Sequence, residues 1–364
     1  MSDLLEVKDL GVQFITEDGI VHAVDGISYS VASGTTLGIV GESGSGKTVS
    51  SLTTMGLTRS RTTRISGRIM FEGRDLLTAS AEDLRRIRGN EIAMIFQDPL
   101  SSLHPFYKVG TQLIETVLAH REVSRGAARD RAVELLQLVG IPDPTRRVNQ
   151  YPHEFSGGMR QRAMIAMALA NEPKLLIADE PTTALDVTVQ AQILALIQDL
   201  QNRLGMAVIM ITHDLGVVAE IADEIAVMYA GRIVEHGSTG QIFEAPQHPY
   251  TWGLLKSIPR LDSGRDELVP ISGRPPSLIH RPSGCFFHPR CPYVRDRHRR
   301  IDPRLEPVPG DHGHEVACLL EAPLRAKIWE GLRVGRDPAA MRGLAEDGAA
   351  STPAAASAPE GGAL

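Results

Sequence analysis

An eight-residue stretch, Gly41–Thr48, constrains this chain more than any other part of its sequence. It reads Gly-Glu-Ser-Gly-Ser-Gly-Lys-Thr and fits the pattern G-x-x-x-x-G-K-S/T. The apolar run Leu37–Val40 precedes it and a segment able to form a helix follows it. The alternative, a glycine-rich turn with an accidental Lys-Thr, leaves this strand-to-helix context unexplained. We therefore predict that the stretch binds the phosphates of a nucleoside triphosphate.

Each residue type in this loop has a physical role in holding phosphate. The glycines let successive backbone N–H groups point at one anion, because no Cβ atom obstructs the curl. Lys47 supplies a compact positive charge for the β- and γ-phosphates, and the Thr48 hydroxyl is placed to ligate Mg²⁺. The candidate nucleotide-binding residues of the loop are Gly41, Ser43, Gly44, Gly46, Lys47 and Thr48.

A second apolar run, Leu175–Ala178, ends in two carboxylates, Asp179 and Glu180. Consecutive apolar residues suit a strand buried on both faces of a parallel sheet, and such sheets bind ligands beyond the carboxyl ends of their strands. We expect Asp179 to hold Mg²⁺ through its water shell and Glu180 to polarise the attacking water. The two acids could instead cap the next turn, but the Lys47 loop favours the catalytic interpretation. A Glu at 180, in place of Gln or Ser, indicates hydrolysis as well as binding.

The segment Phe155–Arg162 reads Phe-Ser-Gly-Gly-Met-Arg-Gln-Arg and predicts a helix start. Ser156 is a good N-cap, and the glycines after it expose backbone N–H groups of a helix that we expect to run through Ala170. The segment resembles the signature sequence of ATP-binding-cassette (ABC) proteins, although Phe155 and Met159 replace the commonest Leu and Gln of that signature. The resemblance implies that a serine and two glycines contact the γ-phosphate held by a second subunit. These residues are Ser156, Gly157 and Gly158.

Three more segments resemble ABC motifs in the expected order. Ile95–Pro99 resembles the Q-loop, in which Gln97 would sense the γ-phosphate and the metal. Ala184–Asp186 resembles the D-loop. Ile209–Asp214 resembles the strand that ends in the switch histidine, here His213.

Phe14 lies where the ABC family places an aromatic residue that stacks on adenine, although a Phe on an early strand is more often part of a core. The resemblance covers about residues 4–238 and implies ATP and Mg²⁺ as cofactors. It assigns three catalytic residues, which are Glu180, His213 and Gln97. It assigns the magnesium ion to Thr48, Gln97 and Asp179.

Composition and charge indicate a globular chain without a membrane span. Its 364 residues, 42% hydrophobic and 23% charged, suit two or three domains with a large core. A net charge of −6 gives no electrostatic reason to expect nucleic acid as a partner. No run of about 18 apolar residues occurs, and Met1–Leu4 lacks the features of a signal peptide. Three cysteines without an export signal indicate reduced thiols or metal ligands in the cytosol.

We expect an α/β fold with an ABC-type P-loop NTPase core, a helical subdomain and a loop-rich C-terminal extension. Apolar residues recur at helical spacing between Ser124 and Gly140, which supports the helical part. The low-complexity end of the chain is predicted to be disordered. The expected boundaries are 1–97 and 171–238 for the core, 98–170 for the helical subdomain, 239–336 for the extension and 337–364 for the tail.

Two segments beyond residue 239, His248–Leu255 and Gly284–Pro292, resemble the C-terminal extension of oligopeptide and dipeptide permease ATP-binding subunits. The Pro- and Gly-rich stretch 278–292 disfavours regular elements and predicts a looped structure that needs a staple.

Three alternatives remain for what holds this looped structure together. In this subfamily the extension commonly holds four cysteines that resemble a 4Fe–4S iron–sulfur site; Cys285, Cys291 and Cys318 match three of them, and His298 stands at the remaining position. A histidine can replace a cysteine as an iron ligand. The same four residues suit a tetrahedral zinc ion. In the third alternative the site has decayed and leaves buried thiols. Any cluster would be structural, because it lies outside the nucleotide motifs.

The resemblance implies an ATP-hydrolysing subunit that energises an ABC importer of oligopeptides or dipeptides. Because one cassette does not enclose a nucleotide by itself, a second ABC ATPase subunit, a related but non-identical chain, is expected to face it head to tail. Two transmembrane permease subunits and an extracytoplasmic substrate-binding protein would complete the complex at the cytoplasmic face of the membrane. Nickel or another small solute is an alternative cargo. A soluble non-transport ABC ATPase is a further alternative, but the single cassette without a coiled-coil insertion argues against it.

Overall fold

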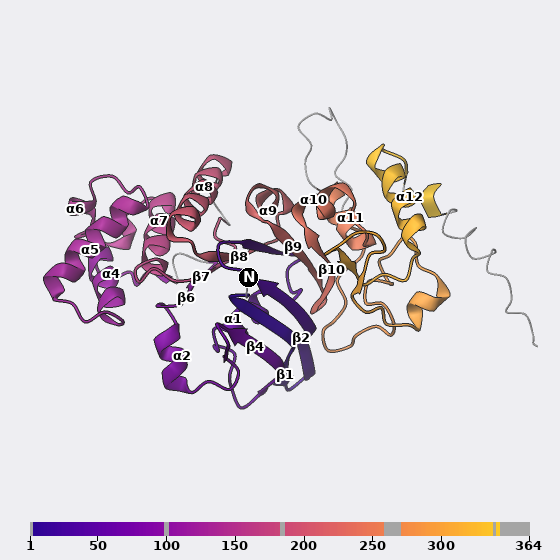
Figure 1. Cartoon of the computed structure of the whole chain (residues 1–364), viewed down its shortest axis with the longest axis horizontal. Coiled ribbons are helices and arrows are strands. Elements are labelled where there is room, and N and C mark those ends of the chain that lie inside the picture. Colours follow the sequence, from indigo (N-terminus) through magenta and orange to yellow (C-terminus); the bar gives the residue numbers. More distant parts are fainter. Residues whose placement is uncertain (1–2, 98–101, 183–185, 258–270, 338–339, 343–364) are drawn as a thin grey trace, which may run out of the picture.

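Two β-sheets form the centre of the fold, with helices at one end and a loop-rich extension at the other (Figure 1). The computed structural model describes residues 3–97, 102–182, 186–257, 271–337 and 340–342. The larger sheet has the strand order β11-β12-β10-β9-β3-β8-β7-β6, and its strands from β9 to β6 are parallel. These parallel strands are β3 (Thr36–Val40), β6 (Ile92–Ile95), β7 (Leu175–Asp179), β8 (Ala207–Thr212) and β9 (Glu224–Tyr229).

The smaller sheet is antiparallel and packs against the larger one. Its order is β2-β1-β4-β5, formed by β1 (Leu5–Thr16), β2 (Gly19–Val31), β4 (Thr63–Phe71) and β5 (Arg74–Asp75). Apolar side chains of both sheets, among them Leu10, Phe71 and Ile209, form one buried cluster. Gly67 of β4 has a φ of +93°, and a Cβ atom there would lie 2.4 Å from the Asp9 carbonyl oxygen, so this position requires glycine.

Helices pack against the two sheets. They are α1 (Lys47–Thr54), α2 (Ala81–Ile87), α8 (Val187–Leu204), α9 (Leu215–Ile221) and α10 (Thr239–Glu244). Helix α1 contacts β1 and β2, and α9 contacts β3 and β8. Asp186 caps α8 by accepting a 2.9 Å hydrogen bond from the Val189 N–H. Residues 98–99 of the predicted Q-loop and 184–185 of the predicted D-loop lie outside the described residues.

The helical part of the chain follows β6 and lies at one end of the molecule (Figure 1). The helices predicted after Ser124 and Ser156 are present, and both serines accept a hydrogen bond from the third residue of their helix; a further helix begins after Lys108. Their apolar faces form a buried cluster with β6, β7, β8 and α8. The elements are α4 (Val109–Leu118), α5 (Arg125–Leu138), α6 (Pro144–Arg147), η1 (Pro152–Glu154) and α7 (Gly157–Ala168).

The extension wraps its loops around β10 and α11. As expected, residues 278–292 form neither helix nor strand. An unpredicted helix, α12, packs Trp329 and Ile328 into a cluster with Trp252, which gives the extension an apolar core of its own. No helix within the described ranges is long and apolar enough to cross a membrane. The elements are β10 (Arg232–Ser238), α11 (Pro249–Lys256), η2 (Asp296–Arg299), β11 (Glu306–Pro307), β12 (Glu315–Val316) and α12 (Ala322–Arg333).

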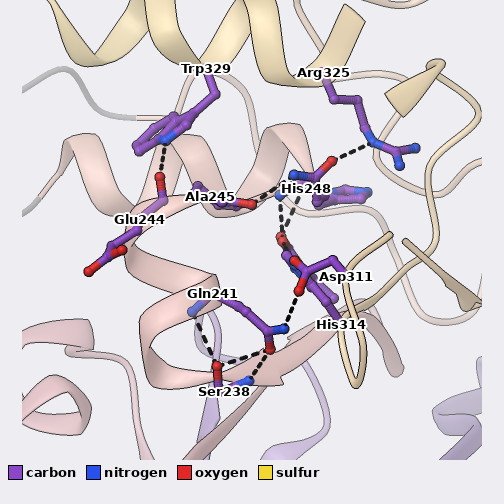
Figure 2. Close-up of polar contacts among 12 residues, drawn as sticks. Ser238, Gln241, Glu244, Ala245, His248, Asp311, His314, Arg325 and Trp329 are labelled. Atoms are coloured by element: carbon purple, nitrogen blue, oxygen red, sulfur yellow. Dashed lines mark hydrogen bonds and ion pairs between the residues drawn. The ribbon is translucent and has the colours of Figure 1, made fainter. Parts of the chain in front are cut away.

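A buried polar network fastens the extension to β10 and α10. Figure 2 shows His314 beside Asp311, and Asp311 beside Gln241 of α10. His314 Nε2 lies 2.9 Å from Glu235 Oε1, and both side chains are fully buried. Backbone N–H groups of Gln247 and His248 also donate to the Glu235 carboxylate. In the described residues, the extension is therefore held at least in part by the buried pair of Glu235 and His314 and by the apolar cluster around Trp329.

Candidate active site

The loop Gly41–Thr48 connects the buried strand β3 to helix α1, as its sequence predicts. Gly41 and Gly46 have φ values of +154° and +101°. A Cβ atom at Gly41 would lie 2.2 Å from the Met228 carbonyl oxygen, and one at Gly46 would lie 2.3 Å from that of Ala23. Both positions therefore require glycine for conformation and for space. Ser43 and Gly44 are exposed at the tip of the loop.

Lys47 points back into its own loop. Its Nζ donates to the carbonyl oxygens of Gly41 at 2.7 Å and Glu42 at 3.0 Å, and the residue is buried. Burial lowers the pKa of the Lys47 ammonium from its usual value, while Glu180, Asp179 and Glu42 oppose that shift. The lysine is thus a buried cation held by neutral oxygens, which a phosphate can replace.

Thr48 and Asp179 lie together although 131 positions separate them. Thr48 Oγ1 donates a 3.2 Å hydrogen bond to Asp179 Oδ1. Burial raises the pKa of Asp179, and the nearby charge of Glu180 acts in the same direction. A hydroxyl and a carboxylate at the carboxyl end of a parallel strand are the oxygen ligands that Mg²⁺ prefers.

Gln97, Glu180 and His213 form a second polar group beside the loop. Gln97 Nε2 donates to Glu180 Oε2 at 2.8 Å, and His213 Nδ1 lies 3.2 Å from Glu180 Oε1. Each of the three follows the carboxyl end of one of three neighbouring parallel strands, β6, β7 and β8. Glu180 has a φ of +48°, a conformation that L-residues adopt at a cost, and its N–H donates to the Ile211 carbonyl.

The signature residues and Phe14 lie on other elements. Ser156 caps α7 through a 3.3 Å hydrogen bond from the Met159 N–H, and Ser156 and Gly157 are exposed. Gly158 is partly buried. Figure 1 shows α7 in the helical part, away from α1. Phe14 is on β1, opposite Val21, and is partly buried against the core between the sheets.

Two residues at this site were missed by sequence reasoning. Tyr250 of α11 and Arg290 of the extension both contact Glu42, the second residue of the phosphate loop. Arg290 lies within the segment Gly284–Pro292, which sequence reasoning singled out, but that segment was interpreted through its cysteines and not through its arginine.

The four predicted metal ligands of the extension line one small cavity, together with His248 and His288. Its volume of about 10 Å³ is close to the minimum for a single water molecule. His298 Nδ1 accepts a 2.8 Å hydrogen bond from the Arg295 N–H. Burial raises the pKa of Cys318 to about 12 and raises the pKa of Cys285 and Cys291 as well. No group of three or more His, Cys, Asp or Glu residues among those described is arranged to hold a metal ion, so the geometry does not support the predicted cluster.

A glycine-rich loop between a buried parallel strand and a helix, with an acid pair on a strand two places away in the sheet, defines the class of P-loop nucleotide-binding proteins. The comparisons with known proteins narrow this class. The family described as ABC transporter matches residues 24–183, and the oligopeptide/dipeptide transporter C-terminal region matches residues 234–297.

Two curated relatives match nearly the whole chain. The oligopeptide transport ATP-binding protein OppD of Bacillus subtilis is 56% identical over 306 residues, which are 84% of each chain. The dipeptide transport ATP-binding protein DppD of the same organism is 54% identical and covers 88% of this chain and 96% of its own. A dimeric ATP-binding cassette in a post-hydrolysis state, bound to ADP and Pi, superposes with a TM-score of 0.58 at 25% identity, covering 65% of this chain and 98% of that one. The chain belongs to the ABC ATPases, in the family of oligopeptide and dipeptide transport ATP-binding proteins.

Proposed function

We propose that this chain hydrolyses ATP to energise the import of oligopeptides or dipeptides across the cytoplasmic membrane. The observation that carries the proposal is the convergence of Lys47, Asp179 and Glu180 beside Gln97 and His213 in one chain. Similarity to peptide transport ATP-binding proteins over both the cassette and the extension supports the cargo class.

The residues at the loop would divide the work as follows. The loop N–H groups and Lys47 bind the phosphates, and Phe14 stacks on the adenine. Thr48, Asp179 and Gln97 hold Mg²⁺, which neutralises charge that develops on the phosphates. Glu180 orients and polarises the attacking water, and Gln97 and His213 orient Glu180. The remaining nucleotide-contacting residues of the loop are Gly41, Ser43, Gly44 and Gly46.

The exposed signature residues support a second cassette as partner. The α7 N-terminus at Ser156, Gly157 and Gly158 offers N–H groups that favour an anion. In a head-to-tail pair these groups would complete the site of a related, non-identical chain. Two permease subunits and an extracytoplasmic binding protein would complete the importer, with this chain peripheral at the cytoplasmic face.

We propose a structural metal site at the thiol cavity of the extension on the basis of its donor set alone, because in the described residues its present geometry is not arranged to hold a metal ion. Cys285, Cys291, His298 and Cys318 line one cavity, and their donor set suits an iron–sulfur cluster or, alternatively, zinc. A bound metal would hold the thiols as thiolates and fasten the loops around residues 278–320. A cavity of about 10 Å³ has no room for an iron–sulfur cluster, so binding one would require the lining side chains to move apart.

Reconstitution tests the transport function. The chain is co-expressed with its two permease subunits and second cassette, placed in proteoliposomes and supplied with the binding protein. Dipeptides or longer peptides should stimulate ATP hydrolysis and accumulate inside. Stimulation of ATP hydrolysis by nickel and not by peptides would show that the cargo is a metal ion and not a peptide. Full activity without the membrane subunits would overturn the transport role itself.

A further inference from the structure

The first turn of the phosphate loop is held by the C-terminal extension. The Glu42 N–H donates a 2.8 Å hydrogen bond to the Tyr250 hydroxyl oxygen. The Glu42 carboxylate accepts two hydrogen bonds from Arg290, at 2.6 Å from Nη1 and 2.9 Å from Nη2. Only the Glu42 carbonyl oxygen is held from within the loop, by Lys47 Nζ and by the Ser45 N–H. Two of the three polar groups of Glu42 are therefore fixed by residues that lie more than two hundred positions later in the chain.

Arg290 is itself fixed by the extension. Its side chain is 3% exposed. Its Nε donates to the Ser272 carbonyl oxygen at 3.1 Å and its Nη2 to that of Ile271 at 3.2 Å. The guanidinium lies 5.8 Å from the ring centre of Tyr229 and 6.0 Å from that of Phe287, within the range of cation–π attraction. The position of the charge is therefore set before any nucleotide arrives.

Tyr250 is equally constrained. It is fully buried on α11, and its ring centre lies 4.7 Å from that of Tyr229 and 5.5 Å from that of Phe287. These rings form one apolar cluster between β9 and the loops of the extension. Movement of α11 or of the loop that carries Phe287 would therefore displace the hydroxyl that holds the Glu42 backbone.

The bidentate pair also has an electrostatic consequence. Glu42 places a carboxylate inside a loop that binds a polyanion, and that charge acts on Lys47. An unpaired Glu42 would repel the triphosphate and compete with it for the Lys47 ammonium. Arg290 neutralises the carboxylate and fixes its position through two hydrogen bonds.

We propose that the C-terminal extension is part of the ATP site, in which Arg290 and Tyr250 are positioning residues that set the conformation and charge of the phosphate loop through Glu42. This inference rests on the assignment of Gly41–Thr48 as the ATP loop. It makes nucleotide affinity dependent on the folded state of the extension.

Nucleotide titration of the purified full-length chain with a fluorescent ATP analogue tests this proposal. Arg290→Met keeps the length of the side chain but removes its donors, and the Kd should rise about tenfold or more. Arg290→Lys retains the charge and should restore part of the affinity. The double variant Glu42→Gln/Arg290→Met removes the unpaired carboxylate and should bind ATP better than Arg290→Met alone. In the reconstituted complex, KM for ATP should rise more than kcat falls.

Arg281→Met is the matched control. Arg281 also belongs to the extension and also pairs with a carboxylate of the cassette, Asp25 at 2.6 Å, and it lies 5.4 Å from the ring centre of Phe286. Its loss should lower thermal stability but leave the Kd of the folded protein unchanged, as a purely structural role would.

A folded Arg290→Met variant with wild-type Kd and KM would overturn the proposal. If that variant does not fold, Tyr250→Phe decides: it removes the acceptor of the Glu42 N–H and should raise the Kd, and unchanged affinity would overturn the proposal equally. Lys47→Ala, measured in parallel, distinguishes failure of this proposal from failure of the loop assignment. Wild-type affinity for ATP in Lys47→Ala would refute the assignment of Gly41–Thr48 as the ATP loop.

Discussion

Gln97 Nε2 donates a 2.8 Å hydrogen bond to Glu180 Oε2, although the two residues are 83 positions apart. Gln97 follows the end of β6 and Glu180 the end of β7, and these strands are parallel neighbours. The hydrogen bond links the segment that resembles the Q-loop to the acid that we assign to water activation. A movement of Gln97 would therefore change the orientation of Glu180, which gives a direct route from the surface around residue 97 to the chemistry.

The first prediction concerns Glu180. Glu180→Gln keeps the shape of the side chain but removes the charge that polarises water. We expect ATP binding to remain and kcat in the assembled complex to fall at least about 100-fold. Glu172→Gln is the control, because Glu172 also has a positive φ, +58°, but forms a surface pair with Arg131. Hydrolysis by Glu180→Gln at the wild-type rate would show that another group activates the water.

The second prediction concerns Lys47. Lys47→Ala removes the buried ammonium that donates to the carbonyl oxygens of Gly41 and Glu42. ATP affinity should fall by at least about tenfold, measured by nucleotide titration. Lys174→Ala is the control, since Lys174 pairs with Glu72 on the surface. Equal affinities of the two variants for ATP would contradict the assignment of the loop.

The sequence predicted well which of the proposed site residues would lie together, because their arrangement is local or follows from strand order. The loop glycines and Lys47 are contiguous in sequence, and their conformation is dictated by the turn that they form. Gln97, Glu180 and His213 each follow a short buried strand, so parallel pairing of β6, β7 and β8 brings them together. Here a motif and its secondary structure were sufficient.

The extension was predicted less well because its contacts are long-range and its sequence has no periodicity. The contact between Arg290 and Glu42 spans 248 positions, and nothing near either residue in the sequence indicates the other. The Pro- and Gly-rich stretch was correctly predicted as looped, but its fastening was sought only at the three cysteines and His298, as a cluster, a zinc site or buried thiols. The structure adds an aromatic cluster around Phe287 and the buried pair of Glu235 and His314.

The third prediction concerns the thiol cavity. If the four side chains bind an iron–sulfur cluster, protein purified without oxygen should be brown and contain iron and sulfide in comparable amounts. Cys318→Ser should bleach the colour and increase proteolysis within residues 278–320. Cys318 is the preferred position, because Cys291 adjoins Arg290 and its replacement would also disturb the phosphate loop. One zinc per chain with no iron would select the alternative metal, and neither metal would mean a lost site.

The last prediction concerns the pH dependence of the extension. Both ring nitrogens of His314 face carboxylate oxygens, with Nε2 2.9 Å from Glu235 and Nδ1 2.8 Å from Asp311. Each contact is favourable only if that nitrogen carries a proton, so His314 is held as an imidazolium ion. Burial lowers the pKa of His314, but the hydrogen bonds and charges of Glu235 and Asp311 outweigh it and raise the pKa above the usual 6.5.

Because the folded pKa of His314 lies above the unfolded value, its contribution to stability is complete below about pH 6.5. That contribution is lost as the pH rises through the folded pKa. Urea unfolding of the wild type should therefore show a free energy of unfolding that falls as the pH rises above about 6.5. His314→Gln leaves the Glu235 charge buried without a cation and should cost about 3–5 kcal/mol at pH 6. Its stability should depend less on pH in the same interval.

His312→Gln, at an exposed position two residues away, should keep the wild-type profile. Parallel pH profiles for wild type and His314→Gln would mean that the histidine is neutral in the folded protein.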